Sequence, residues 1–277
     1  MLSLLWLVFM LLSNNRLVVA SCAYGTSLSR RETAVDLPNF GYGTTDGPIN
    51  WHAISPENWL CASGTLQSPI NIDQSVPMMP PGFVTINIPV QENVKFENLG
   101  TTVEVVMTGE TTVGNQTFTM KQFHFHTPSE HRINNEHFPV EVHMVHEAAG
   151  SQIAVISMIA QVSAVSTAPL DIVISNVNAI PNPGMTTTIP ILELSQMVQV
   201  INQMAFFSYT GSLTTPPCTE GINFLVSSRV IPLQVDMYNG LKAVVGTNNR
   251  HIQNTAGKQN ILAIGAQNVR AQQQRQL

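Results

Sequence analysis

The stretch QFHFHTPSEHR, at residues 122–132, places histidines on alternate positions of an aromatic run. Aromatic and β-branched residues favour strands, and successive side chains of a strand point to opposite faces of the sheet. His124 and His126 therefore share one face, while Phe123 and Phe125 share the other. The stretch predicts a strand whose aromatic side packs a core and whose other side presents two imidazoles.

A second stretch, VEVHMVH at residues 140–146, follows the same alternation. Glu141 and His143 share one face of this predicted strand, whereas His146 points to the other face, where we interpret it as a core histidine. If the two strands are neighbours, His143 meets the two imidazoles of the first strand. Three neutral imidazoles with an open fourth position form the ligand set of a catalytic zinc.

Two alternatives to a three-histidine zinc site follow from the same residues. The first is a group of core histidines satisfied by hydrogen bonds, although histidines are seldom buried in such a group without a function. The second is a non-haem iron site, which takes two histidines and one carboxylate. Glu130 or Glu141 would then supply the carboxylate.

Short segments rich in β-branched residues recur along most of the chain. Strands are expected at residues 69–73, 85–89, 94–97, 101–107, 117–125, 140–146, 153–162, 206–210 and 222–226. Helices are expected at Leu170–Ile180, within Leu192–Ala205 and at Gln234–Val245. We therefore expect a mixed α+β, mainly β domain, with about ten strands in one large, mostly antiparallel, twisted central sheet and a few peripheral helices.

The N-terminus predicts export. Leu2–Leu12 (LSLLWLVFMLL) is almost wholly apolar, too short for a membrane span and typical of the core of a signal peptide. Small residues suited to cleavage follow at Ala20 and Ala23. We expect residues 1–23 to be a signal peptide and residues 24–277 to be a secreted, extracellular domain. A membrane-tethering N-terminus is the alternative.

The three cysteines and a glycosylation motif fit that compartment. Cleavage after Ala23 removes Cys22 and leaves Cys61 and Cys218, which would then form a disulfide that closes a long loop. Asn115 begins the sequon Asn-Gln-Thr directly after a glycine, in an expected hairpin tip where a glycan would face solvent.

The composition excludes one class of partner. Only 10% of the residues are charged and the formal net charge is −5, so the chain has no basic stripe for nucleic acid. We also expect no stable membrane span once the signal peptide has been removed.

Four motifs, in this order, carry a resemblance to a known family: QSPINI at 67–72, QFHFHTPSEH at 122–131, EVHMVH at 141–146 and YTGSLTTPPC at 209–218. Over residues 40–266 the chain resembles the α-class carbonic anhydrases. The resemblance implies a domain core over that range. It leaves residues 267–277 as a polar tail, which we expect to be frayed.

The resemblance also implies the chemistry. A carbonic anhydrase is a zinc lyase, a carbonate dehydratase, in which zinc-bound hydroxide attacks CO2 to give bicarbonate and a proton. The implied zinc ligands are His124, His126 and His143. A side esterase activity and inhibition by sulfonamides and anions are implied as well.

Further residues take their roles from the same resemblance. Gln122, Glu141 and a backbone carbonyl at Asn248 would orient the three imidazoles. Thr214 would donate its hydroxyl proton to Glu130. A hydroxyl has one proton, so Thr214 could then only accept from the attacking hydroxide, and these two residues are the expected catalytic pair.

Carbon dioxide carries no charge, so the resemblance implies an apolar pocket wall, with Thr215 touching bicarbonate. The expected pocket residues are Val145, Val155, Leu213, Thr215, Ile222, Phe224 and Val226. Phe224 stands where many relatives carry tryptophan, which alters the pocket floor.

Thr101 stands where highly active animal enzymes carry a proton-shuttling histidine, and threonine does not titrate near neutrality. Catalytically silent relatives that act as binding modules usually lose a zinc histidine, whereas this chain retains all three.

Overall fold

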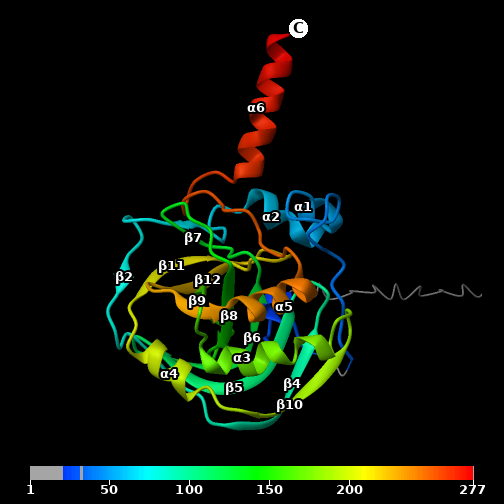
Figure 1. The fold of residues 1–277 in the computed structure, drawn as a ribbon. Helices are drawn as coiled ribbons and strands as arrows, with labels where there is room; N and C mark the ends of the chain where they lie inside the picture. Colours follow the sequence, from blue (N-terminus) through cyan, green and yellow to red (C-terminus); the bar gives the residue numbers. More distant parts are fainter. Residues whose placement is uncertain (1–20, 32–33, 277) are drawn as a thin grey trace, which may run out of the picture.

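The computed structural model describes residues 21–31 and 34–276. The apolar stretch Leu2–Leu12, predicted to be the core of a signal peptide, lies outside the described residues. The described chain is built on one 11-stranded sheet with short helices around it (Figure 1). The predicted class, mainly β with one large sheet and few helices, is confirmed.

Thirteen strands occur in the described residues. They are β1 (Asn71–Ile72), β2 (Met78–Met79), β3 (Val84–Asn87), β4 (Gln91–Asn98), β5 (Val103–Val113), β6 (Gln116–His126), β7 (Arg132–Ile133), β8 (Val140–Glu147), β9 (Ile153–Ser163), β10 (Thr186–Leu192), β11 (Phe206–Ser212), β12 (Glu220–Ser227) and β13 (Ile231–Gln234). The large sheet runs β10-β4-β5-β6-β8-β9-β12-β11-β2, with β3 beside β5 and β13 beside β9. Its pairs are antiparallel, except that β12 and β13 run parallel to β9. β1 and β7 form a separate parallel pair.

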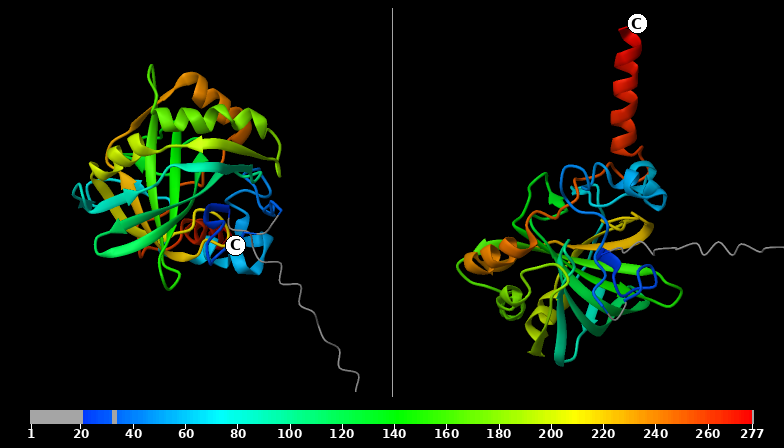
Figure 2. Two further views of the ribbon diagram at one scale, coloured as in Figure 1. Left: turned by 90° about the horizontal axis from the view of Figure 1, so that it is seen from below. Right: turned by 90° about the vertical axis from the view of Figure 1, so that its right-hand side faces the viewer.

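The helices lie around the sheet, except α6, which projects away from the body. They are α1 (Trp51–Ile54), α2 (Leu60–Ser63), α3 (Ala168–Ser175), α4 (Ser195–Asn202), α5 (Val235–Val245) and α6 (Ile261–Arg275), with 3₁₀ turns η1 (Ser21–Ala23), η2 (Pro56–Trp59) and η3 (Val177–Ala179). α3, α4 and α5 cover one face of the sheet (Figures 1 and 2).

The aromatic side of the histidine strand packs a core, as predicted. Phe123 and Phe125 of β6 lie in the main apolar cluster, under the buried residues of α3 and α5. Val142 and Met144 of β8 join them from the neighbouring strand. Burying each of these side chains contributes about 1.5–3 kcal/mol, which commits this face of both strands to the core and leaves the other face for the imidazoles.

The C-terminal tail differs from the expectation. Instead of a frayed segment at 267–277, the structure has helix α6, which projects from the body as far as Arg275 (Figures 1 and 2). The Asn260 side chain accepts a hydrogen bond from the backbone N–H of Leu262 and so caps the start of the helix. Alanine, glutamine and arginine favour helix, but no residue of α6 is buried, so the sequence carries no amphipathic signal for it.

Other segments differ from the prediction as well, among them α3 and β10. The helix expected at Leu170–Ile180 is shorter, because α3 ends at Ser175 and a 3₁₀ turn continues the chain. Strand β10 was not among the expected strands, and it contains Pro190, a residue that is unfavourable inside a sheet. It lies at the edge of the large sheet, where the missing N–H of proline is tolerated.

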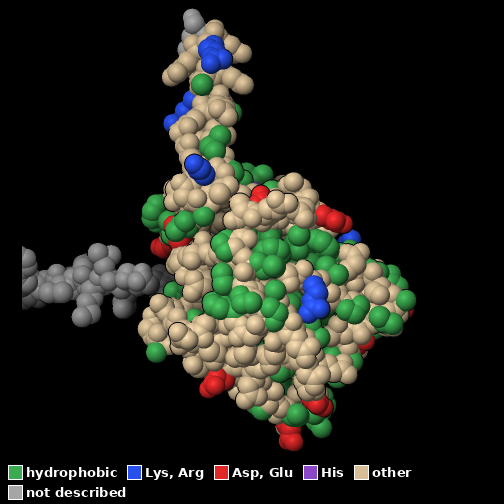
Figure 3. Space-filling view, turned by 90° about the vertical axis from the view of Figure 1, so that its left-hand side faces the viewer, with side chains coloured by type: hydrophobic (Ala, Val, Ile, Leu, Met, Phe, Trp, Pro, Cys, Tyr) green, Lys and Arg blue, Asp and Glu red, His purple; other side chains and the backbone are tan. Residues whose placement is uncertain are grey.

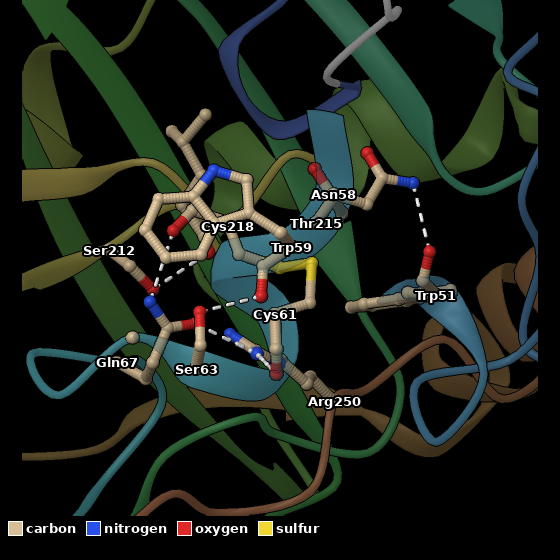
Figure 4. Close-up of a disulfide and its surroundings, with 12 residues drawn as sticks. Trp51, Asn58, Trp59, Cys61, Ser63, Gln67, Ser212, Thr215, Cys218 and Arg250 are labelled. Carbon is tan, nitrogen blue, oxygen red and sulfur yellow. Dashed lines mark hydrogen bonds between the residues drawn. A yellow bond between two sulfur atoms is a disulfide. The ribbon is translucent and has the colours of Figure 1, made fainter. Parts of the chain in front are cut away.

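Cys61 and Cys218 form the predicted disulfide (Figure 4). The bond joins α2 to the turn that follows Thr214, and the Arg250 guanidinium donates to the Cys61 carbonyl oxygen at 3.2 Å. Cys22, which cleavage after Ala23 would remove, is unpaired and buried. Its removal stays a prediction.

The surface reflects the low charge content. The face shown in Figure 3 is mostly uncharged, with a patch of apolar side chains and only scattered acidic and basic groups. Within residues 21–31 and 34–276, no helix combines the length and the apolar character that crossing a membrane requires.

Candidate metal centre

Three histidines meet on the face of the sheet opposite the aromatic core. β6 and β8 are antiparallel neighbours, and His124 lies directly across from His143 in their register. His126 follows two positions along β6, on the same face. One nitrogen from each of the three rings lies within 4.8 Å of the others, and all three residues are buried. The assumption that the two predicted strands are neighbours is confirmed.

His124 and His126 are each held by one ring nitrogen. His124 Nδ1 lies 2.8 Å from Gln122 Oε1. His126 Nδ1 lies 3.0 Å from the carbonyl oxygen of Asn248. Both oxygens can only accept, so each Nδ1 carries the proton and each Nε2 keeps its lone pair. These two Nε2 atoms have no hydrogen-bond partner among the described residues.

Burial keeps all three rings neutral. It lowers the pKa of His126 and of His143, and it lowers the pKa of His124 well below the usual value, with the two neighbouring imidazoles adding to the effect. A neutral imidazole is the form that binds a metal. Two buried lone pairs without a partner are costly unless a ligand takes them up, so the cluster fits a metal ion.

Glu141 holds the third histidine. Its Oε1 accepts from His143 Nε2 at 2.6 Å and from His131 Nδ1 at 2.6 Å. Its Oε2 accepts two backbone N–H groups at 2.8 Å, those of Glu130 and His131. Burial raises the pKa of Glu141, but the two imidazoles outweigh burial and hold this pKa well below its usual range. Nδ1 of His143 is thereby left to face the other two histidines.

His131, Glu141 and His143 form a second group whose ligand atoms lie within 4.8 Å of one another. Those atoms already bond to each other, and His131 Nε2 lies 2.7 Å from the hydroxyl of Tyr209. Apart from His143 Nδ1, the group therefore has no donor free for a metal, which argues against an iron site with Glu141 as its carboxylate ligand.

Ser157 also lies at this centre, and it was not predicted from the sequence. It lies across from His143 in the register of β8 and β9, and its hydroxyl donates to Glu141 Oε1 at 2.5 Å. Three donors thus converge on one carboxylate oxygen. A signal was present, since Ser157 interrupts an otherwise apolar run, IAVISMIA, in a buried strand.

Glu130 and Thr214 lie at the same centre. Glu130 Oε1 accepts from the backbone N–H of Arg250 at 2.9 Å, and Oε2 lies 3.6 Å from His126 Nε2. Burial raises the pKa of Glu130 to about 7, and the Thr214 hydroxyl is close enough to oppose this rise. In the described part of the chain, however, neither Thr214 Oγ1 nor Glu130 Oε2 has a hydrogen-bond partner. The predicted pair is therefore adjacent but not bonded.

An apolar wall lies beside the histidines. The six apolar residues expected in the pocket are all buried in one cluster: Val145, Val155, Leu213, Ile222, Phe224 and Val226. Thr215 is buried as well. Phe224 stacks on Tyr209 with ring centroids 5.3 Å apart, and its edge meets the His143 ring at 5.8 Å. The phenylalanine thus packs directly against one of the three histidines.

Asn115, the predicted glycosylation site, is not one of these residues. It is exposed in the turn between β5 and β6, where the sequence predicted a hairpin tip. The side chain is therefore accessible to a modifying enzyme.

Fold and site together define a class of protein: a large β-sheet that carries a buried cluster of three histidines able to hold a metal ion. Residues 46–276 match the eukaryotic-type carbonic anhydrase family. The chain is 33% identical over 230 residues to the carbonic anhydrase of Pectobacterium atrosepticum, which covers 82% of this chain and 91% of that one. The chain belongs to the carbonic anhydrase family and is a lyase; the family's function is zinc-dependent hydration of CO2.

Solved structures agree with this assignment. The fungal α-carbonic anhydrase of Aspergillus oryzae superposes with a TM-score of 0.80 at 39% identity, covering 82% of this chain and 98% of that one. The α-carbonic anhydrase of Thermovibrio ammonificans, solved with the inhibitor sulfanilamide, gives a TM-score of 0.71 at 30% identity over 80% of this chain and 98% of that one.

Proposed function

We propose that His124 and His126 bind zinc through Nε2 and His143 through Nδ1, and that this centre performs the reversible hydration of CO2. The main support is that each ring's other nitrogen already bonds to an acceptor, which aims the three remaining lone pairs at one another. Three imidazoles match the ligand set of a catalytic zinc. When bound, zinc supplies a Lewis acid that activates a water molecule for attack on CO2.

The residues around the histidines position the reactants. Gln122, Glu141 and the Asn248 carbonyl keep the rings in one orientation, as hydrogen-bonded neighbours of metal ligands do. The Thr214 hydroxyl needs only to turn toward the unpartnered Oε2 of Glu130 to donate its proton there. It then offers lone pairs alone to the attacking water, and this fixes the direction of attack.

The apolar wall suits an uncharged substrate. Val145, Leu213 and Phe224 expose no charge to the pocket and exclude water from the side on which CO2 would lie. Thr215, next to Thr214, would hold the bicarbonate product. The same centre would attack activated esters slowly and would take sulfonamides and inorganic anions as inhibitors.

Proton removal completes each cycle. Thr101 is buried, and its hydroxyl has no hydrogen-bond partner among the described residues. A threonine hydroxyl does not titrate near neutrality. We therefore propose that proton export to buffer limits the rate at high CO2.

We also propose that the enzyme works outside the cell. The disulfide between Cys61 and Cys218 supports an oxidising compartment, the apolar stretch Leu2–Leu12 supports a signal peptide, and exposed Asn115 supports glycosylation. The low charge content and the absence of a basic stripe argue against a nucleic-acid partner.

The zinc assignment is tested by removing one ligand and one unrelated histidine. His143→Ala should lose bound zinc and CO2 hydration, because two imidazoles and a buried Glu141 hold the ion far more weakly. His137→Ala is the control, because His137 is exposed and lies outside the cluster. Zinc per chain, measured by atomic absorption after dialysis, is the readout. Undiminished zinc in His143→Ala, or iron in the purified protein, would contradict the proposal.

A further inference from the structure

The N-terminal segment Ser21–Arg31 folds back against the apolar wall beside the three histidines. Cys22, Ala23 and Tyr24 are buried, with exposures of 4%, 0% and 0%. Cys22 and Ala23 belong to the same apolar cluster as the pocket wall. The η1 turn that carries them contacts β8, the strand of His143. The segment therefore takes up space that the apolar wall would otherwise leave to a small substrate.

The contact with Thr215 shows how close this segment comes to the chemistry. The backbone N–H of Cys22 donates to Thr215 Oγ1 at 3.3 Å, and the Thr215 hydroxyl lies 2.9 Å from Cys22 Sγ. Thr215 is the residue that would hold bicarbonate. While its one proton is directed at Cys22 Sγ, the Thr215 hydroxyl cannot donate a hydrogen bond to the product.

The far end of the segment is anchored by charge. The Arg31 guanidinium pairs with the carboxylates of Glu97 and Glu104, both of which are fully buried. Glu104 lies across from His124 in the register of β5 and β6, so this anchor is next to the metal centre. Arg31 also lies over the Tyr24 ring, 4.5 Å from its centroid.

A positive side chain of the segment thus pairs with two buried negative side chains of the body, and this pairing favours the docked position of the segment. Glu97 also pairs with the Lys95 ammonium group, whereas Glu104 pairs with Arg31. A buried carboxylate that loses its partner is strongly destabilised, so Glu104 above all favours the state in which Arg31 is in place. Ser27 adds an exposed contact, from its backbone N–H to Glu147 Oε1 at 2.9 Å. The segment is thus held at both ends and in the middle.

We infer that Ser21–Arg31 is a built-in ligand that closes the pocket, so that the chain is latent until the segment is displaced or removed. The inference rests on the proposed function, since it concerns access to that same centre. It requires signal cleavage after Ala20, which keeps Ser21–Ala23 in the secreted chain; cleavage after Ala23 would remove the residue that contacts Thr215.

The reactivity of the Cys22 thiol shows whether the segment is docked or displaced, because the thiol is buried while the segment is docked. Cys61 and Cys218 are bridged, so Cys22 is the free thiol of the three cysteines. Burial raises its pKa to about 11, which keeps the thiol unreactive while the segment is bound. The secreted, zinc-loaded protein is mixed with Ellman's reagent, with and without sulfanilamide. Labelling should be slow alone and at least about tenfold faster with saturating sulfanilamide, because two ligands that exclude each other weaken each other reciprocally.

Two pairs of variants test the anchors. Arg31→Ala should raise the labelling rate, kcat/KM for CO2 and the affinity for sulfanilamide, each by at least about tenfold, because a partner of buried charges is lost. Arg30→Ala is the matched control, since Arg30 is exposed and adjacent. If Arg31→Ala unfolds the protein, Ala23→Asp takes its place as the test variant. It puts a charge into the buried part of the segment and changes no residue outside the segment. Leu28→Asp, at an exposed position of the same segment, is then the control.

The outcomes separate the two proposals. Fast labelling of the unliganded protein, a rate indifferent to sulfanilamide, or a secreted chain that begins at Tyr24 would each overturn the inference. A zinc-free protein whose thiol is still protected would instead overturn the zinc assignment and leave the contact between the segment and the pocket standing. Slow labelling that sulfanilamide and Arg31→Ala both accelerate would support the inference.

Discussion

Replacing Cys61 and Cys218 together by alanine removes a cross-link between residues 157 positions apart. A cross-link restricts the unfolded chain, and the restriction grows with the logarithm of the loop length. For a loop of this length the lost entropy is about 17 cal/mol/K, or roughly 5 kcal/mol at 25 °C. We therefore expect the double alanine variant to lose about 4–6 kcal/mol of unfolding free energy, near the upper end of the range for native disulfides.

The local contacts make this a clean test of the cross-link. Arg250 donates to the Cys61 carbonyl oxygen at 3.2 Å, and Gln67 Nε2 donates to the Cys218 carbonyl oxygen at 3.1 Å (Figure 4). Both acceptors are backbone atoms, which alanine keeps. The folded state should therefore lose the two sulfur atoms and their packing, and little else.

Guanidinium unfolding of the zinc-free protein gives the free energy without a contribution from metal binding. The melting temperature should fall by roughly 10–20 °C, because a protein of this size shifts about 2–4 °C per kcal/mol. Cys22→Ala is the control, since it removes a cysteine but no cross-link. A loss below about 1 kcal/mol in the double variant would refute the reasoning, because it would mean that the long loop does not govern the entropy of the unfolded chain.

Two other residues give further predictions. Burial lowers the pKa of His146 to about 4 in the folded protein, so the unfolded chain binds a proton at this residue first as the pH falls. The free energy of unfolding should therefore decrease between pH 6.5 and pH 4, by about 3 kcal/mol from this group. Urea unfolding at several pH values checks this: His146→Leu should flatten the slope over that window, and an unchanged slope would contradict it. Ser157→Ala removes one donor to Glu141 and should weaken zinc binding by about tenfold in competition with a chelator. Ser163→Ala on the same strand is its control, and equal affinities would exclude a role for Ser157.

Much of the site could be predicted because it rests on local periodicity. In a strand, alternation alone decides that His124 and His126 share a face and that Phe123 and Phe125 share the other. The resemblance then supplied Gln122 and the other partners, since the motifs keep their order and spacing. The helix over most of tail residues 267–277 could not be predicted, because an exposed helix with no buried face leaves no hydrophobic pattern in the sequence.

The sequence by itself determined the fold class, the faces of the two histidine strands and the identity of the three imidazoles. Only the tertiary structure decided that β6 and β8 are neighbours in a register that sets His124 opposite His143. It also brought Ser157 to Glu141 and placed Cys22 against Thr215, 193 positions away. Side-chain alternation is a property of a few consecutive residues, whereas such contacts depend on the packing of whole elements, which no short stretch of sequence encodes.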